Sequence, residues 1–169
     1  EDGIAKIAGL MLFSSHEGNS AAGLTDSQKD YLTNSYVRNI TDAAGNDVED
    51  SVRWVNAMQE YVEISDFNVP VDFSSDPRST AGSGDLYSDN VSSGVTDISK
   101  WPSNIGLAAT FDTEHMYNFA KASSAEYRAL GIVTALGPQI DLATEPRWLR
   151  VGGTFGENTK LSTDMAQAM

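Results

Sequence analysis

The sequence contains no cysteine, and this absence excludes disulfides, thiolate metal sites and a cysteine nucleophile. Basic residues are also scarce, because 11 Lys and Arg stand against 24 Asp and Glu, which gives a formal net charge of −13 at pH 7. Such a surface repels a phosphate backbone, so nucleic acid is not an expected partner. No apolar run approaches the roughly 20 residues that a membrane span requires, so no membrane partner is expected either.

The apolar content is sufficient for one domain with a real core, since 40% of the 169 residues are hydrophobic and 9% are aromatic. The glycines of segment 82–94 do not follow a strand into a helix, as a phosphate loop requires, and the aspartates between 85 and 97 fit no calcium-loop spacing. The sequence therefore predicts no cofactor and no metal. Acidic charge without cysteine is compatible with a periplasmic or secreted protein, which is the expected localisation.

Apolar periodicity predicts helices that alternate with strands. In the first half, we expect a short helix from residue 2, a buried strand at 10–13, a weakly helical segment at 24–36, an extended segment at 36–40, a helix capped by Ser51, and a short strand at 71–73. In the second half, Asp112 is the expected N-cap of a helix that ends at Gly131, and His115 in its first turn is expected to be solvated. A buried strand at 132–136 and a helix from residue 161 follow.

This succession of βα units predicts a parallel sheet. Polar side chains that carry chemistry lie just past the carboxyl ends of parallel strands, and three clusters fall there: residues 15–17, 76–78 and 141–150. Segment 74–100, rich in Ser, Gly and Asp, is far longer than an ordinary βα connection. It is therefore expected to be a lid or binding loop, or to be disordered.

Two blocks near the end of the chain have a specific pattern. Residues 137–150 read Gly-Pro-Gln-Ile-Asp-Leu-Ala-Thr-Glu-Pro-Arg-Trp-Leu-Arg, and residues 154–157 read Thr-Phe-Gly-Glu. Together with segments 5–8, 69–76, 101–112 and 126–132, they resemble the family 3 glycoside hydrolases, which include β-glucosidases and β-xylosidases. The resemblance spans nearly the whole chain. It implies an α/β fold in which residues 1–169 form the first half of a (β/α)8 TIM-type barrel, incomplete here because such a barrel takes about 250 residues.

The sequence departs from the family pattern at a few positions. Leu149 stands where the family usually has Gly, Gly152 and Gly153 replace an aromatic residue and Glu, and Asn158-Thr159 replaces Asp-Pro. The usual His shortly after Asp76 is also missing. These departures are typical of a subfamily and bear on the sugar and the linkage more than on the fold.

The resemblance implies two substrate-binding residues. Asp76 matches the Asp that accepts hydrogen bonds from sugar hydroxyls, a role that suits a carboxylate because charge-assisted bonds are strong. Without the resemblance, an Asx turn before Pro77 would be the preferred interpretation. Arg150 matches the sugar-binding Arg that closes the Pro-Arg-Trp block, where a planar donor fork can hold a diol.

Three further residues are weaker candidates for substrate binding. Arg147 is as readily explained by a structural pair with Asp141 or Glu145 that fixes the loop. Trp148 is first of all a loop anchor, with stacking on a sugar as the minority interpretation. Arg78 on the long loop could reach the site or be solvated.

No catalytic residue is assigned to this chain. The family's Lys-His-Phe motif and its nucleophilic Asp motif do not occur in these residues, and its acid/base comes from elsewhere. A retaining glycosidase needs two carboxyl groups about 5 to 5.5 Å apart, one of which attacks the anomeric carbon. The expected partners are thus a β-linked oligosaccharide or glucoside and the remaining C-terminal part of the same enzyme; a homodimer is an open option.

The resemblance implies a retaining, exo-acting β-glucosidase that removes terminal non-reducing β-D-glucosyl residues. A β-xylosidase of the same family is the near alternative, because the two differ by the pocket for one hydroxymethyl group. A catalytically silent carbohydrate-binding fragment is an alternative from another class. An unrelated α/β sensor or binding protein would require both sequence blocks to be coincidental.

Overall fold

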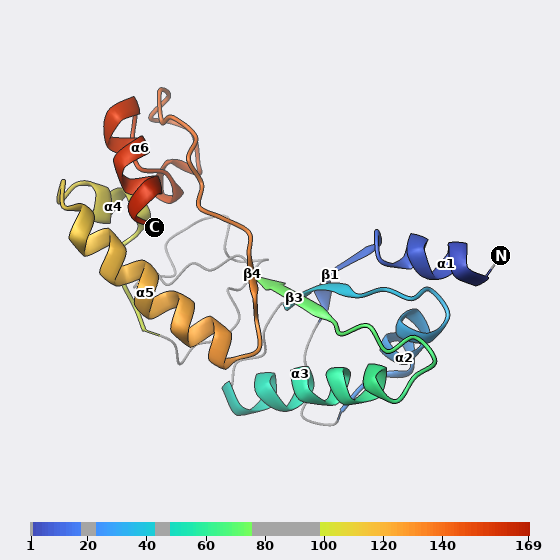
Figure 1. The fold of residues 1–169 in the computed structure, drawn as a ribbon. Coiled ribbons are helices and arrows are strands. Elements are labelled where there is room, and N and C mark those ends of the chain that lie inside the picture. The colour runs from blue at the N-terminus through green and yellow to red at the C-terminus, as the bar shows by residue number, and fades with distance from the viewer. Residues whose placement is uncertain (1, 18–22, 43–47, 76–98) are drawn as a thin grey trace. The chain divides into compact units, whose positions relative to one another are not determined.

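The computed structural model describes residues 2–17, 23–42, 48–75 and 99–169 (Figure 1). Its elements are α1 (Asp2–Gly9), β1 (Phe13–Glu17), α2 (Asp26–Thr33), β2 (Asn39–Asp42), α3 (Val48–Glu63), β3 (Asp72–Ser75), α4 (Asn104–Ala108), α5 (Thr113–Ala129), β4 (Thr134–Ala135), η1 (Val151–Gly153) and α6 (Thr159–Ala168). They fall into two compact units. Among the described residues, the sheet unit comprises those up to 75 and 128–134, and the helical unit comprises 99–127 and 135–169.

The sheet has the strand order β1-β2-β3-β4. β1 pairs with β2 and β2 pairs with β3, and both pairings are parallel, as the βα succession predicts. The contact to the fourth strand begins where Val133 N donates to Phe73 O at 3.0 Å. Next to it, Thr134 Oγ1 donates to the Asp72 carboxylate at 2.8 and 3.1 Å.

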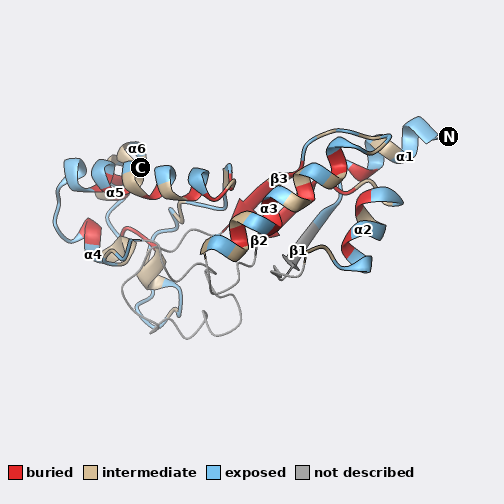
Figure 2. Ribbon diagram, turned by 90° about the horizontal axis from the view of Figure 1, so that it is seen from below, coloured by how far each residue is buried: buried red, intermediate tan, exposed pale blue. Residues whose placement is uncertain are grey.

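The core of the sheet unit lies between α3 and the strands β2 and β3. Trp54 and Met58 on α3 and Ile40 and Phe73 on the strands are all fully buried, and the red side of α3 in Figure 2 faces the sheet. The Trp54 and Phe73 rings pack edge to face with centroids 5.5 Å apart. Because each fully buried side chain of this size stabilises the fold by about 1.5–3 kcal/mol, this contact fixes α3 on the sheet.

The prediction of a buried strand at 10–13 is wrong. α1 continues into a turn in which the amides of residues 10, 11 and 12 donate to the carbonyls of residues 6, 8 and 9, and Met11 is 83% exposed. Asn39 Nδ2 on β2 donates to the carbonyls of Leu10 and Leu12, so this backbone has partners without joining the sheet. β1 consequently starts at Phe13 and takes in residues 14–17, so the 15–17 cluster lies within the strand rather than after it.

Other boundaries also differ from those expected. α3 begins at Val48, so Ser51 is a fully buried helical residue and not a cap. The strand expected at 132–136 is confirmed only at Thr134–Ala135, and Val133 is exposed rather than buried. α4 was not expected from periodicity. Segment 76–98, which holds most of the expected long loop, lies outside the described residues.

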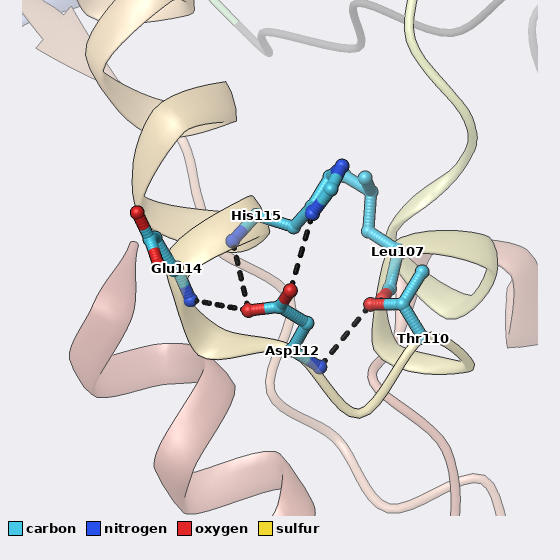
Figure 3. Close-up of polar contacts among 5 residues, drawn as sticks. All are labelled: Leu107, Thr110, Asp112, Glu114 and His115. Carbon is cyan, nitrogen blue, oxygen red and sulfur yellow. Dashed lines mark hydrogen bonds and ion pairs between the residues drawn. The ribbon is translucent and has the colours of Figure 1, made fainter.

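The start and the end of α5 are as predicted. Figure 3 shows Asp112 at its N-terminus, where Oδ1 accepts from the amides of Glu114 (2.9 Å) and His115 (3.3 Å) and Oδ2 faces His115 Nδ1 at 3.3 Å. These hydrogen bonds, that of the His115 ring first, lower the pKa of Asp112. His115 is solvated, with 64% of its side chain exposed. Gly131 follows the helix with φ +85°, the left-handed conformation that glycine adopts without strain.

Arg38 is the one charged residue in the described core, and only 2% of it is exposed. Its guanidinium donates to four backbone carbonyls, those of residues 32, 37, 67 and 69. It also lies 4.9 Å from the centre of the Phe67 ring. Burial lowers the pKa of Arg38, and no ion pair to it is found in the described part of the chain. The side chain therefore joins the end of α2, the start of β2 and the segment before β3 through these hydrogen bonds and its contact with the Phe67 ring.

Arg38→Ala should lower the free energy of unfolding by about 3 kcal/mol or more, because buried carbonyls that lose their donor cost about 1–3 kcal/mol each. Urea unfolding of the purified protein measures this change. The control is Arg53→Ala on α3, an exposed arginine paired with Glu49, which should change stability by less than about 0.5 kcal/mol. Equal losses for both variants would contradict the role given to Arg38.

Candidate functional site

The predicted site residues that the structure describes lie in one loop, residues 136–158 of the helical unit. The loop is built from successive turns in which Trp148 N donates to Glu145 O (3.0 Å), Val151 N to Trp148 O (3.2 Å) and Gly153 N to Arg150 O (3.1 Å). Its base is closed where Ala143 N donates to Gly156 O at 3.1 Å. The Pro-Arg-Trp block is thus a hydrogen-bonded run of turns and not an irregular connection.

The Thr-Phe-Gly block anchors this loop. Phe155 is fully buried among apolar residues of α4, α5 and α6, including Leu107, Phe119 and Met165. Thr154 Oγ1 donates to Val151 O at 2.8 Å and accepts from Gly156 N at 3.1 Å. The Thr-Phe-Gly block therefore packs in the core and holds the Pro-Arg-Trp block in place.

α4 contributes a contact that periodicity missed. Asn104 Nδ2 donates to Gly153 O at 3.1 Å, which ties η1 to the start of α4. A Cβ at Gly153 would lie 2.7 Å from Gln139 Oε1, so the absence of a side chain there lets Gln139 approach the turn. The signal for α4 was the Pro102-Ser103 pair, since Ser is a favoured N-cap and Ser103 occupies that position.

Glu145 and Arg147 form a bidentate ion pair. Arg147 Nε donates to Glu145 Oε1 and Nη2 to Oε2, each at 2.8 Å, and the Arg147 amide donates to Oε1 at 2.9 Å. The side chains are 50% and 87% exposed, respectively. The hydrogen bonds from the guanidinium and then from the amide lower the pKa of Glu145 to about 2, and the same pair raises the pKa of Arg147. The alternative in which Arg147 pairs with Glu145 is confirmed.

Arg150 is exposed and directly precedes η1, and Trp148 is half-buried two residues earlier. The structure thus brings Arg147, Trp148 and Arg150 onto one run of turns. Asp76 and Arg78 lie outside the described residues, so their roles stay predictions.

Within the described ranges, no three His, Asp or Glu side chains are grouped as metal ligands. No helix within those ranges is long and apolar enough to cross a membrane.

The profile of the "Glycosyl hydrolase family 3 N terminal domain" matches residues 6–169. The chain belongs to this family. It is 38% identical over 171 residues to the "Periplasmic beta-glucosidase/beta-xylosidase" of Dickeya chrysanthemi, a match that covers 97% of this chain and 26% of that protein. It is 37% identical over 117 residues to "Beta-glucosidase C" of Emericella nidulans, covering 68% of this chain and 18% of that protein.

Solved structures agree on the fold. "Beta-glucoside phosphorylase BglX" has a TM-score of 0.70 and 18% identity, covering 97% of this chain and 25% of that one. NagZ from Neisseria gonorrhoeae has a TM-score of 0.67 and 13% identity, covering 93% and 44%. The expected fold, the N-terminal part of a TIM-type barrel domain, is confirmed, and the chain spans about a quarter of the length of its first relative.

The low pKa of Glu145 predicts the pH dependence of the loop. A carboxyl whose pKa is lowered in the folded protein stabilises the fold at pH values above its usual pKa of 4.5. That contribution is lost as the pH falls through about 2. Carbon NMR should show Glu145 titrating near pH 2, and in Arg147→Gln the midpoint should rise toward 4.5. A midpoint that stays unchanged in this variant would contradict the pairing.

Proposed function

We propose that this chain is part of a retaining, exo-acting β-glucosidase. The observation that carries the proposal is the family match over residues 6–169, together with relatives of 37–38% identity whose names specify β-glucosidase activity. The Pro-Arg-Trp and Thr-Phe-Gly blocks support it further, because the structure joins them in one loop that carries Arg150. Relatives named as periplasmic support a periplasmic or secreted location.

In this proposal, Asp76 accepts hydrogen bonds from sugar hydroxyls and Arg150 donates to them. Such contacts orient the ring, and those that strengthen as the ring flattens favour an oxocarbenium-like transition state. The nucleophile and the acid/base come from the remaining C-terminal part of the enzyme, and Trp148 and Arg78 are lesser candidates for contacts with the substrate. No step requires a metal or a cofactor, because two carboxyl groups suffice for this chemistry.

A β-xylosidase is the second candidate, favoured by the Dickeya chrysanthemi relative whose name includes both activities. The two substrates differ by one hydroxymethyl group, which a pocket discriminates by only about 1–3 kcal/mol. A single enzyme could therefore hydrolyse both at rates that differ about 10- to 100-fold.

The test compares p-nitrophenyl β-glucoside and β-xyloside as substrates of the full-length enzyme. We expect the higher kcat/KM on the glucoside, and proton NMR should show the β-anomer of glucose as the first product. Faster turnover of the xyloside would favour the second candidate, and release of sugar phosphate on addition of inorganic phosphate would indicate a phosphorylase. If neither substrate is turned over but glucose binds, the chain belongs to a carbohydrate-binding protein.

Arg150→Ala should lower kcat/KM about 10- to 100-fold, because a hydrogen bond to a charged group contributes about 1.5–3 kcal/mol. Arg150→Lys should recover only part of the loss, since Lys lacks the planar fork. The control is Lys121→Ala on α5, an exposed cation outside the loop, which should leave the kinetics unchanged. Wild-type kinetics in Arg150→Ala would remove Arg150 from the site.

A further inference from the structure

We propose that Glu145 and Arg147 are a positioning pair that fixes the turn from which Arg150 is presented to the sugar. The proposal rests on the proposed function, in which Arg150 is the residue that contacts the substrate. It assigns Arg147 a role through Glu145 rather than on the sugar itself.

The pair closes a turn around Pro146. Three N–H groups of Arg147, one from the backbone and two from the side chain, donate to the two carboxylate oxygens of Glu145. The backbone closes the same turn where Trp148 N donates to Glu145 O at 3.0 Å. The pair therefore spans residues 145–147, and the backbone hydrogen bond closes the overlapping turn of residues 145–148.

The position of this turn sets the position of Arg150. The next turn starts at the Trp148 carbonyl, which accepts from Val151 N, and the one after it starts at the Arg150 carbonyl, which accepts from Gly153 N. The far end is held by Asn104 and by the buried Phe155. Arg150 therefore lies between the end held by Asn104 and Phe155 and the turn that the Glu145–Arg147 pair closes.

The pair is unlike an ordinary surface ion pair, which loses side-chain entropy and contributes little. Its partners are two residues apart, and Pro146 between them already restricts the backbone. The bidentate geometry makes it one of the exposed pairs that can hold a fixed conformation. Because both side chains are exposed, its loss should loosen the loop and leave the core intact.

The same geometry gives Arg147 and Arg150 different roles. Arg147 directs its Nε and Nη2 donors at Glu145, so this edge of its planar fork is already occupied by the carboxylate. Its charge is also balanced by the carboxylate. Arg147 therefore acts through Glu145, and the sugar contact is the one that the proposed function gives to Arg150.

The test uses Glu145→Gln and Arg147→Lys in the full-length enzyme. The matched control is Asp164→Asn on α6, which breaks an exposed ion pair to Lys160 (2.7 Å) in the same unit but outside the loop. In both loop variants we expect KM for the glucoside to rise about 5- to 10-fold with kcat within about 2-fold, the pattern of lost uniform binding. Arg147→Lys keeps the charge but not the fork, so it should resemble Arg147→Gln rather than wild type.

Hydrogen exchange and thermal unfolding give a second readout that does not need turnover. The amides of Val151 and Gly153 should exchange about 10-fold faster in both loop variants, with Tm lowered by no more than about 2–4 °C because an exposed pair contributes about 1 kcal/mol at most, and the control should match wild type in all measurements.

Loop variants that behave like Asp164→Asn would overturn the proposal. Faster exchange without a change in KM would also overturn it, because the loop would then be held without positioning Arg150. If the unmodified enzyme turns over neither glycoside, the proposed function fails on its own, and glucose affinity measured by calorimetry replaces KM in the same comparison.

Discussion

The sheet unit depends on one buried guanidinium that is satisfied by carbonyls rather than by a carboxylate. Arg38 begins the extended segment that becomes β2, and its donors bind the carbonyls that end α2 and precede β3. The carbonyls of residues 67 and 69 belong to non-repetitive backbone, and that of Leu32 lies in the last turn of α2, where carbonyls lack a following helical amide. With Arg38 in place, both connections are fixed at the edge of the core, where Ile40 and Phe73 on the neighbouring strands are buried with Trp54 on α3.

The loop that carries Arg150 is held in place differently from the backbone around Arg38. Several of its amides donate within its own successive turns and most of its residues are exposed to solvent, so it does not need a buried charge. Its place is set by an apolar anchor, Phe155, and by a single amide contact from Asn104. Such a loop can be rigid near its anchor while its polar side chains stay in water.

The sequence allowed the long elements and the family signature to be predicted because these rest on local signals. Asp112 and Gly131 bound α5 as their capping chemistry dictates, and the βα order was enough to expect parallel pairing. The strand at 10–13 failed because Asn39, 27 to 29 residues away, satisfies that backbone, and no local pattern records such a contact. Within the site, the Glu145–Arg147 pair could be foreseen from spacing, but the Asn104 contact to Gly153 spans 49 residues and could not.

The structure of the loop also shows what two of the departures from the family pattern do physically. Leu149 replaces the usual glycine, yet it is 63% exposed and sits inside a turn whose hydrogen bonds are intact. Gly153 replaces a side chain where Gln139 now approaches to a distance that no Cβ would allow. Leu149 adds apolar surface directly before Arg150, and Gly153 makes room for the Gln139 side chain beside η1. The turns between these two residues are kept. Both changes therefore alter the surroundings of Arg150 without breaking the hydrogen bonds of these turns.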